Sequence, residues 1–225
     1  MWQCRIGPWK WPAGHRWEAY RDLKAELVSV GTELLLGEIV DTNAAYISRE
    51  LAQIGVDVYY RHTVGDNCGR LAEVLKLAFH RSDIVFTTGG LGPTQDDITR
   101  EAFAKATSLP LVRSPEAAQE IREFFADRDL TPAENNLRQA DFPEGADYFT
   151  NTVGTAPGFA VEHDDAVGYA LPGPPSELKT MWADYVLPDL KQRIDYEGGE
   201  LFTRVLHLAN IGESDTSAAL DDSIA

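Results

Sequence analysis

Apolar runs and amphipathic segments alternate along the chain from residue 25 onward. The runs Leu27–Val30, Val56–Tyr60 and Ile84–Thr88 are short and rich in β-branched or aromatic residues, which is typical of strands. Between them, residues 43–54 and 71–80 repeat apolar side chains every three or four positions, which predicts helices that pack by one face. Two successive strand–helix–strand units predict an α/β fold with a mostly parallel, doubly wound sheet.

Polar residues mark the expected starts of the helices. Asn43 is the expected N-cap of the first helix and Asn67 of the second, because an asparagine side chain accepts hydrogen bonds from the free N–H groups of a first helical turn. A third helix is expected over residues 97–107, with Asp96 and Asp97 at its opening.

The second half of the chain predicts shorter elements. A polar helix is expected over residues 115–128 and a short helix over residues 133–140. Closely spaced strands near Tyr148, Phe159 and Tyr169 indicate a small antiparallel excursion. A last helix then carries Leu178, Met181, Trp182 and Tyr185.

The two ends of the chain differ from this main domain, which we assign to residues 25–195. Residues 1–24 hold four of the five tryptophans, lack periodicity and are interrupted by glycine and proline. They predict an extension outside the core, either an aromatic and basic docking arm or, as we favour, a largely disordered stretch translated from an upstream start codon. Residues 200–225 predict the truncated beginning of a second, small α+β domain.

Charge and composition narrow the range of partners. The 225 residues carry a formal net charge of −16, because 20 lysines and arginines stand against 36 aspartates and glutamates. A field of that sign repels nucleic acids and anionic membranes, so neither is an expected partner. No apolar run approaches the ~18–20 residues of a membrane span. Two cysteines are too few for a disulfide framework, so we expect a cytoplasmic protein.

Candidate chemistry lies in the loops that follow the predicted strands, since ligands of open parallel sheets bind at the carboxyl ends of the strands. Each loop combines glycine or proline with hydroxyl or carboxylate side chains. The candidate ligand-binding residues in these loops are Gly31, Thr32, Glu33, Thr88, Gly89, Gly90, Gly92, Thr94, Pro172, Gly173, Ser176 and Glu177.

The loop after the third strand, residues 87–97, carries the strongest signal. Three glycines in four positions allow the backbone to approach a ligand closely. The loop matches neither Gly-x-x-x-x-Gly-Lys-Ser/Thr nor Gly-x-Gly-x-x-Gly, so it supports neither a P-loop nor a dinucleotide-binding fold. Asp96 and Asp97 have two interpretations here, as caps of the third helix or as members of the site.

Acidic side chains recur in these loops, whereas lysine and arginine are absent from them. If the loops meet at one edge of the sheet, the carboxylates form an oxygen-lined cleft that favours a hard divalent cation bridging phosphate oxygens. Asp97, with Asp66 or Asp96, is the expected metal-binding set, and a small anionic ligand is the expected partner. The acidic residues expected around the cleft are Glu33, Asp66, Asp96, Asp97 and Glu177.

The same loops resemble a known family. The motifs at residues 29–37, 41–43, 64–67, 87–101, 153–158 and 171–177 are similar, in order, to those of the amino-terminal domain of the competence/damage-inducible CinA proteins. That resemblance covers residues 25–214 and implies a MoaB/MogA-like molybdopterin-binding fold, a three-layer α/β sandwich that handles pterin-pyrophosphate or nucleotide-like ligands. Two departures are Pro174, where the family often has an aliphatic residue, and residues 1–24, which have no counterpart.

The resemblance also implies an activity. It implies an ADP-ribose pyrophosphatase that depends on a divalent cation and yields AMP and ribose 5-phosphate, with Asp66 and Asp97 as catalytic residues. We also expect a homo-oligomer. The deamidase activity of longer family members is not carried over, because its domain does not occur in this sequence.

Two alternatives to an enzyme stay open at this point. The first is a binding module that holds a molybdopterin-like or nucleotide ligand without converting it. The second is an inactive fragment that folds but lacks a partner surface or the rest of its chain.

Overall fold

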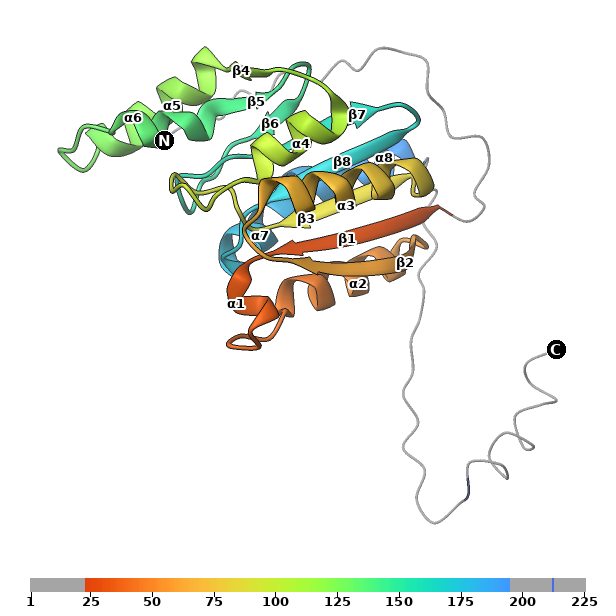
Figure 1. The fold of residues 1–225 in the computed structure, drawn as a ribbon. Coiled ribbons are helices and arrows are strands. Elements are labelled where there is room, and N and C mark those ends of the chain that lie inside the picture. Colours follow the sequence, from red (N-terminus) through yellow and green to blue (C-terminus); the bar gives the residue numbers. More distant parts are fainter. Residues whose placement is uncertain (1–22, 195–211, 213–225) are drawn as a thin grey trace.

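The fold is a three-layer α/β sandwich, seen here in a computed structural model that describes residues 23–194 and 212 (Figure 1). The predicted extension lies outside the described residues except for Leu23 and Lys24, and the predicted second domain does so except for Gly212. Nothing in the structure therefore tests these two assignments.

A six-stranded sheet forms the middle layer, in the order β2-β1-β3-β8-β7-β6. The first four strands in that order run parallel, and β7 and β6 run antiparallel to their neighbours. The predicted parallel sheet and antiparallel excursion are therefore parts of one sheet. The strands are β1 (Lys24–Val30), β2 (Asp57–Val64), β3 (Ile84–Thr88), β6 (Asp147–Phe149), β7 (Gly158–His163) and β8 (Ala166–Leu171).

Helices cover both faces of this sheet, as a doubly wound fold requires. Side chains of β3 alternate between the two cores, since Val85 packs with one cluster while Ile84 and Phe86 pack with the other. The first core contains α3 and α4, and the second contains α2, α7 and α8, which lie on the opposite face (Figure 1). These helices are α2 (Thr42–Gln53), α3 (Cys68–Arg81), α4 (Thr99–Thr107), α7 (Pro175–Met181) and α8 (Leu187–Arg193), with a π-helical segment, Trp182–Val186, joining the last two.

Two of the three predicted helix starts need correction. Asn67 caps α3 as predicted, because its side chain accepts a hydrogen bond from the N–H of Arg70. The cap of α2 is Asp41 and not Asn43, since the Asp41 carboxylate accepts from the N–H of Ala44. Asp96 and Asp97 do not open α4, which begins at Thr99.

The strand β2 continues to Val64, four residues beyond the predicted end at Tyr60. It is an edge strand that pairs only with β1 among the described strands, and most of its side chains are exposed. Polar residues such as Arg61 and Thr63 are therefore tolerated in it. Because they interrupt the apolar run, the sequence pattern does not reveal where the strand ends. Residues after β1 were expected to form an open loop, but they enter the short helix α1 (Thr32–Leu35).

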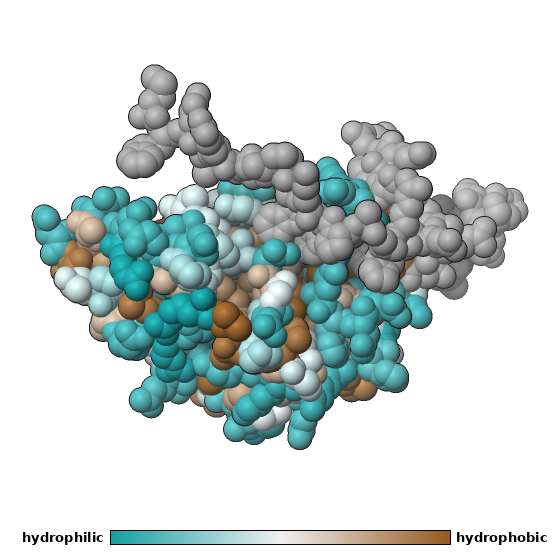
Figure 2. Space-filling model, turned by 90° about the horizontal axis from the view of Figure 1, so that it is seen from above, coloured by the Kyte–Doolittle hydropathy of each residue, from teal (hydrophilic) through white to brown (hydrophobic). Residues whose placement is uncertain are grey.

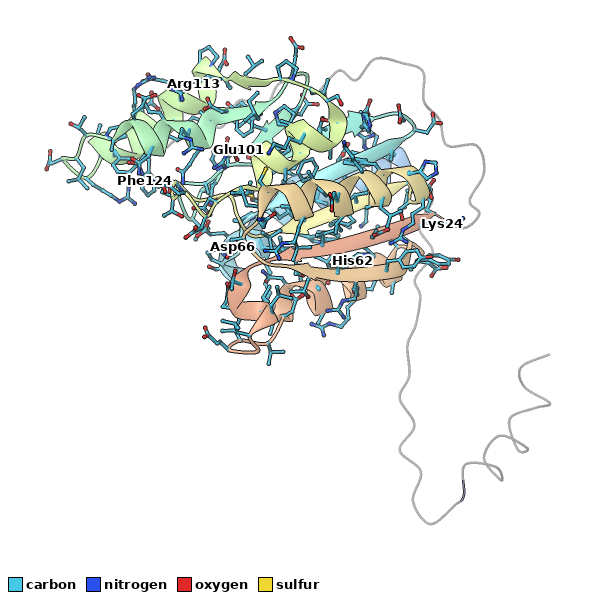
Figure 3. The ribbon with its side chains drawn as sticks, in the orientation of Figure 1. Lys24, His62, Asp66, Glu101, Arg113 and Phe124 are labelled. Carbon is cyan, nitrogen blue, oxygen red and sulfur yellow. The ribbon has the colours of Figure 1, made fainter. Side chains whose placement is uncertain are left out.

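A small lobe between α4 and β6 carries a second sheet of two antiparallel strands. Arg113 holds it together, since its guanidinium donates to Asp141 and to Glu134 at distances of 2.6 and 2.7 Å (Figure 3). The predicted helix 133–140 is here two pieces, α6 and a 3₁₀ turn, η1. The lobe consists of β4 (Leu111–Arg113), α5 (Pro115–Ala126), α6 (Glu134–Leu137), η1 (Arg138–Ala140) and β5 (Asp141–Pro143).

Polar residues dominate the surface of the face shown in Figure 2, and apolar residues form small patches between them. Among residues 23–194 and 212, the structure contains no helix whose length and apolar character would let it span a bilayer.

Candidate functional site

A pocket of about 380 Å³ opens at the carboxyl ends of the parallel strands. Gly31 follows β1, Gly89 follows β3 and Pro172 follows β8, and all three line it. Asp66, which follows β2, lies at the opposite end of the sheet from Lys24, where β1 begins (Figure 3). The volume lies in the range of pockets that bind small molecules.

The glycine-rich loop after β3 presents its carbonyl groups to the start of α4. Thr99 donates from Oγ1 to the carbonyl of Gly89 at 2.7 Å and from its N–H to the carbonyl of Gly90 at 3.1 Å. Arg100 donates through its two Nη atoms to the carbonyls of Leu91 and Gly92, each at 2.8 Å. Four consecutive carbonyl groups are thus bound on one side of the loop.

The first three of these peptides carry the N–H groups of Gly90, Leu91 and Gly92, and the fourth has none because it precedes Pro93. These three N–H groups consequently point away from α4, because the C=O and N–H of a trans peptide face opposite ways. No group among the described residues accepts a hydrogen bond from the N–H of Gly90, Leu91 or Gly92. These residues line the pocket. Backbone N–H groups arranged in this way can bind the oxygens of an anion.

Glycine is needed at two positions of this loop. Gly89 and Gly90 have φ angles of 96° and 68°, in the region that disfavours other residues. A Cβ at Gly89 would overlap the carbonyl oxygen of Val30, and one at Gly90 would overlap Oγ1 of Thr99. The loop conformation therefore depends on residues without a side chain.

Two aspartates of the pocket are held by threonines in the same way. Oδ2 of Asp66 accepts from the N–H and the hydroxyl of Thr32, at 3.1 and 2.7 Å. Oδ2 of Asp97 accepts from the N–H and the hydroxyl of Thr94, at 2.8 and 2.7 Å. Each threonine fixes one carboxylate oxygen and leaves Oδ1 available to another partner.

The interpretation of Asp97 as a helix cap is wrong. The N-cap of α4 is Ile98, which makes no side-chain cap hydrogen bond. Asp97 instead closes a turn with Thr94 inside the loop. Asp96 also lines the pocket, and its side chain is exposed.

Asn151 organises the wall of the pocket that carries Glu177. Its Nδ2 donates to the Glu177 carboxylate at 2.6 Å, and its Oδ1 accepts from the N–H groups of Val153 and Gly154. Another asparagine, Asn43, donates from Nδ2 to the carbonyl of Gly173 at 2.7 Å. Asn43 therefore holds the loop after β8 and does not cap its own helix.

The structure brings most of the sequence-predicted residues to this single pocket. The predicted residues that line it are Gly31, Glu33, Asp66, Gly89, Gly90, Gly92, Asp96, Asp97, Pro172, Gly173 and Glu177. Four others do not line it. Thr32 and Thr94 orient the aspartates, Thr88 is buried at the end of β3, and Ser176 is exposed in the first turn of α7.

Sequence reasoning missed three residues: Arg100, Asn151 and Gln139. The predicted loops lack basic residues, but Arg100 reaches their backbone from α4 and is 3% exposed. Burial lowers the pKa of Arg100, and the nearby charges of Glu101 and Asp97 oppose that effect. Gln139, in η1, is fully buried and lines the pocket. A buried polar residue of this kind leaves no periodic signal in a sequence.

The carboxylates suit a hard cation in their chemistry but do not form a complete cage. No group of three or more His, Cys, Asp or Glu side chains within the described part of the chain is arranged to hold a metal ion. Magnesium-type sites need few protein ligands, because the ion keeps waters and takes oxygens from phosphate groups. The described residues therefore provide oxygen ligands that suit a cation but no preformed metal site.

Comparison with known proteins places this chain in a family. Residues 26–192 match the family model described as "Probable molybdopterin binding domain". A structure of the protein CinA from Thermoplasma acidophilum superposes with a TM-score of 0.69 and 34% identity, over 74% of this chain and 98% of that one. The chain belongs to the CinA family, within the molybdopterin-binding domain family.

Curated relatives carry the same family name. A competence-damage inducible protein of Caldanaerobacter subterraneus is 50% identical over 192 residues, which are 85% of this chain and 46% of the relative. One from Symbiobacterium thermophilum is 50% identical over 202 residues, which are 89% of this chain and 47% of the relative. The chain spans about half the length of these relatives.

The molybdopterin biosynthesis enzyme MoaB of Thermus thermophilus shares the fold. It superposes with a TM-score of 0.52 and 23% identity, over 77% of this chain and 94% of that one. The predicted three-layer fold, with its mostly parallel sheet, is confirmed.

Proposed function

We propose that the pocket binds a diphosphate-containing ligand of the nucleotide or pterin class and hydrolyses it, with ADP-ribose as the substrate to test first. The observation that carries the proposal is the loop Gly89–Gly92. Its four carbonyls are bound by Thr99 and Arg100, and the N–H groups of Gly90, Leu91 and Gly92 have no partner among the described residues. An anion with several oxygens, such as a diphosphate, is the complementary ligand.

The surrounding carboxylates support a ligand that binds together with a cation, and a cation could also promote hydrolysis. Acidic side chains around an anion site repel the ligand unless a cation lies between them. A divalent cation, when bound, would neutralise charge on the diphosphate, and Asp97 with Asp66 or Asp96 would hold it. The hydrogen bonds to Oδ2 of Asp66 and Asp97 fix the orientation of each carboxylate, so the position of each Oδ1 atom is fixed as well.

The reaction itself needs one water molecule. A remaining carboxylate of the pocket, Glu33 or Glu177, orients the water and accepts its proton as the water oxygen adds to a phosphorus atom. The bond from that phosphorus to the bridging oxygen breaks, and the bridging oxygen leaves as part of the second phosphate. ADP-ribose would yield AMP and ribose 5-phosphate.

The test is a panel of phosphoanhydrides that includes ADP-ribose, incubated with and without divalent cations. We expect release of AMP in the presence of cation, loss of the activity in excess chelator, and recovery after cation is added back. Full turnover in excess chelator would remove the cation from the mechanism. The same panel extends to pterin diphosphates, because the two ligand classes share the diphosphate.

A binding module without catalysis is the second candidate, and the backbone contacts of the glycine loop favour it equally. Retention of ligand in chelator without product at any cation concentration would support that module. The hypothesis of an inactive fragment predicts that the protein neither binds nor converts the ligand and that its melting temperature is low. Size-exclusion mass measurement tests the homo-oligomer that we also propose, and cell fractionation tests the proposed cytoplasmic location.

A further inference from the structure

Gln139 is a buried amide without a partner in the wall of the pocket. Its side chain is 0% exposed, and neither Nε2 nor Oε1 has a hydrogen-bond partner among the described residues. The residue lies in the 3₁₀ turn η1 and lines the pocket together with Thr155 and Ala156. Buried polar groups almost always have partners, and an exception calls for an explanation.

An unpaired amide at this place lowers the stability of the ligand-free protein. A side chain that kept neither hydrogen bond would be better replaced by an apolar one of the same volume. A ligand that supplies both missing partners would offset this loss. The amide offers one donor group and one acceptor atom side by side in a plane, so the ligand has to offer the complementary pair.

A phosphate group does not meet this requirement, because its oxygens mainly accept hydrogen bonds and would leave Oε1 unpaired. A carbohydrate hydroxyl offers both functions but does not hold them in a plane. The edge of a heteroaromatic base, such as adenine or the guanine-like ring of a pterin, presents a donor and an acceptor side by side. Glutamine pairs with adenine in this bidentate manner in protein–DNA complexes.

The topology of the sheet separates this wall from the acidic one. In the strand order, β2 and β1 lie on one side of β3, and β8 and β7 lie on the other. Asp66 follows β2, the glycine loop follows the central strand β3, and Thr155 and Ala156 precede β7. The small lobe that contains η1 also lies at the end of the molecule opposite β2 (Figure 1). A ligand with its diphosphate at the glycine loop therefore has Gln139 on the side away from Asp66. Leu91 and Ala156 add apolar surface to the pocket.

We propose that Gln139 is a specificity-determining residue that recognises the donor–acceptor edge of the base in a nucleotide-like or pterin-like ligand. The inference rests on the proposed function in one respect, that such a ligand occupies the pocket. It does not depend on hydrolysis.

The experiment compares Gln139→Met with the wild type by calorimetric titration of AMP, GMP and ribose 5-phosphate, all with divalent cation. Methionine has a similar volume but lacks the amide. We expect binding of the better base, AMP or GMP, to weaken at least tenfold and binding of ribose 5-phosphate to stay within twofold. The AMP and GMP arms separate an adenine site from a pterin-like site, since guanine shares the pyrimidine edge of pterin.

Melting temperatures of the ligand-free proteins give a second readout. We expect Gln139→Met to melt at the same temperature as the wild type or higher, because an unpaired buried amide has been removed. Gln119→Met is the matched control, since Gln119 is exposed on α5 and bonds only to Glu123 among the contacts in the structure. It should alter neither binding nor melting.

Several outcomes would overturn the inference. One is unchanged binding of the base-containing ligands, and another is an equal loss for ribose 5-phosphate. The inference would also be wrong if the wild type bound neither AMP nor GMP. A much lower melting temperature of Gln139→Met would show that the amide is structural, satisfied by water. If that variant does not fold, Gln139→Leu, which also lacks the amide and adds no charge, takes its place in the titration. Base-dependent binding without cleavage of ADP-ribose would refute hydrolysis and support the inference.

Discussion

Replacing Asp97 by asparagine separates the charge of this side chain from its structural contacts. The amide oxygen of asparagine can still accept the hydrogen bonds that Thr94 donates to Oδ2 of Asp97. Bonds to a charged acceptor are worth about 1 kcal/mol more than neutral ones, and Thr94 is exposed. Removal of one carboxylate from a crowded acidic pocket offsets part of that loss. The free energy of unfolding should therefore change by no more than about 1 kcal/mol.

Turnover should respond far more strongly than stability. If Asp97 holds the cation, the neutral amide loses most of the attraction, and hydrolysis of ADP-ribose should fall by ~10²-fold or more. A factor of 10² corresponds to about 2.7 kcal/mol of activation free energy, well above the expected change in stability. The assay is chromatographic measurement of AMP release across a series of cation concentrations, with thermal melting of the same samples.

Asp96→Asn is the matched control for this substitution. It makes the same change in net charge one residue away, on an exposed side chain that lines the same pocket. We expect a milder loss of turnover there, because Asp97 and not Asp96 is the main expected ligand of the cation. A general change in the electrostatic field of the pocket would instead affect both variants equally. A stably folded Asp97→Asn with nearly wild-type turnover would refute the assignment, and so would an equal loss in both variants.

Two further substitutions test the glycine loop of the site and the pH dependence of stability. Gly90→Ala places a Cβ against Thr99 Oγ1 at a positive φ and should lower the free energy of unfolding by about 2–3 kcal/mol. Gly145→Ala, at a φ of 81° with open space around the Cβ, should lower it by only about 1 kcal/mol. Urea denaturation measures both losses, and equal losses would contradict the crowding at Gly90. Burial, followed by the repulsion of Asp189, raises the pKa of Asp147 to about 6. The native carboxyl then binds its proton more tightly than the unfolded one, so its contribution to stability falls as the pH rises from about 4 to 6. Asp147→Asn should therefore melt higher than the wild type at pH 7 and show no such advantage near pH 4; a constant difference across that range would refute the assignment.

The parts of the fold that the sequence predicted well are those where burial leaves a local pattern. The run Ile84–Thr88 is buried on both faces, and its bounds agree with β3. The edge strand β2 was predicted too short, because its outer residues gain nothing from being apolar. Asn43 and Asp41 are both suitable caps, and the choice depends on the distant carbonyl of Gly173, which binds Asn43.

The candidate site was predicted in part for a related reason. The rule that ligands bind at the carboxyl ends of parallel strands selects the loops without a structure, and residues from each of them line the pocket. Arg100 and Gln139 come instead from helical segments, and their approach to the loops depends on how α4 and the small lobe pack. No local pattern in a sequence encodes such a contact.

The way in which Arg100 is used has an electronic consequence for the glycine loop. A peptide whose carbonyl accepts a hydrogen bond becomes polarised, and its N–H becomes a stronger donor. Arg100 binds the carbonyl of Leu91, so the N–H of Gly92 in that peptide gains partial positive charge. The guanidinium thereby exerts its influence through the main chain while it stays buried. A ligand at the loop would contact partial positive charge on main-chain N–H groups. Unlike a charged side chain, these groups cannot move away from the ligand by a change of rotamer.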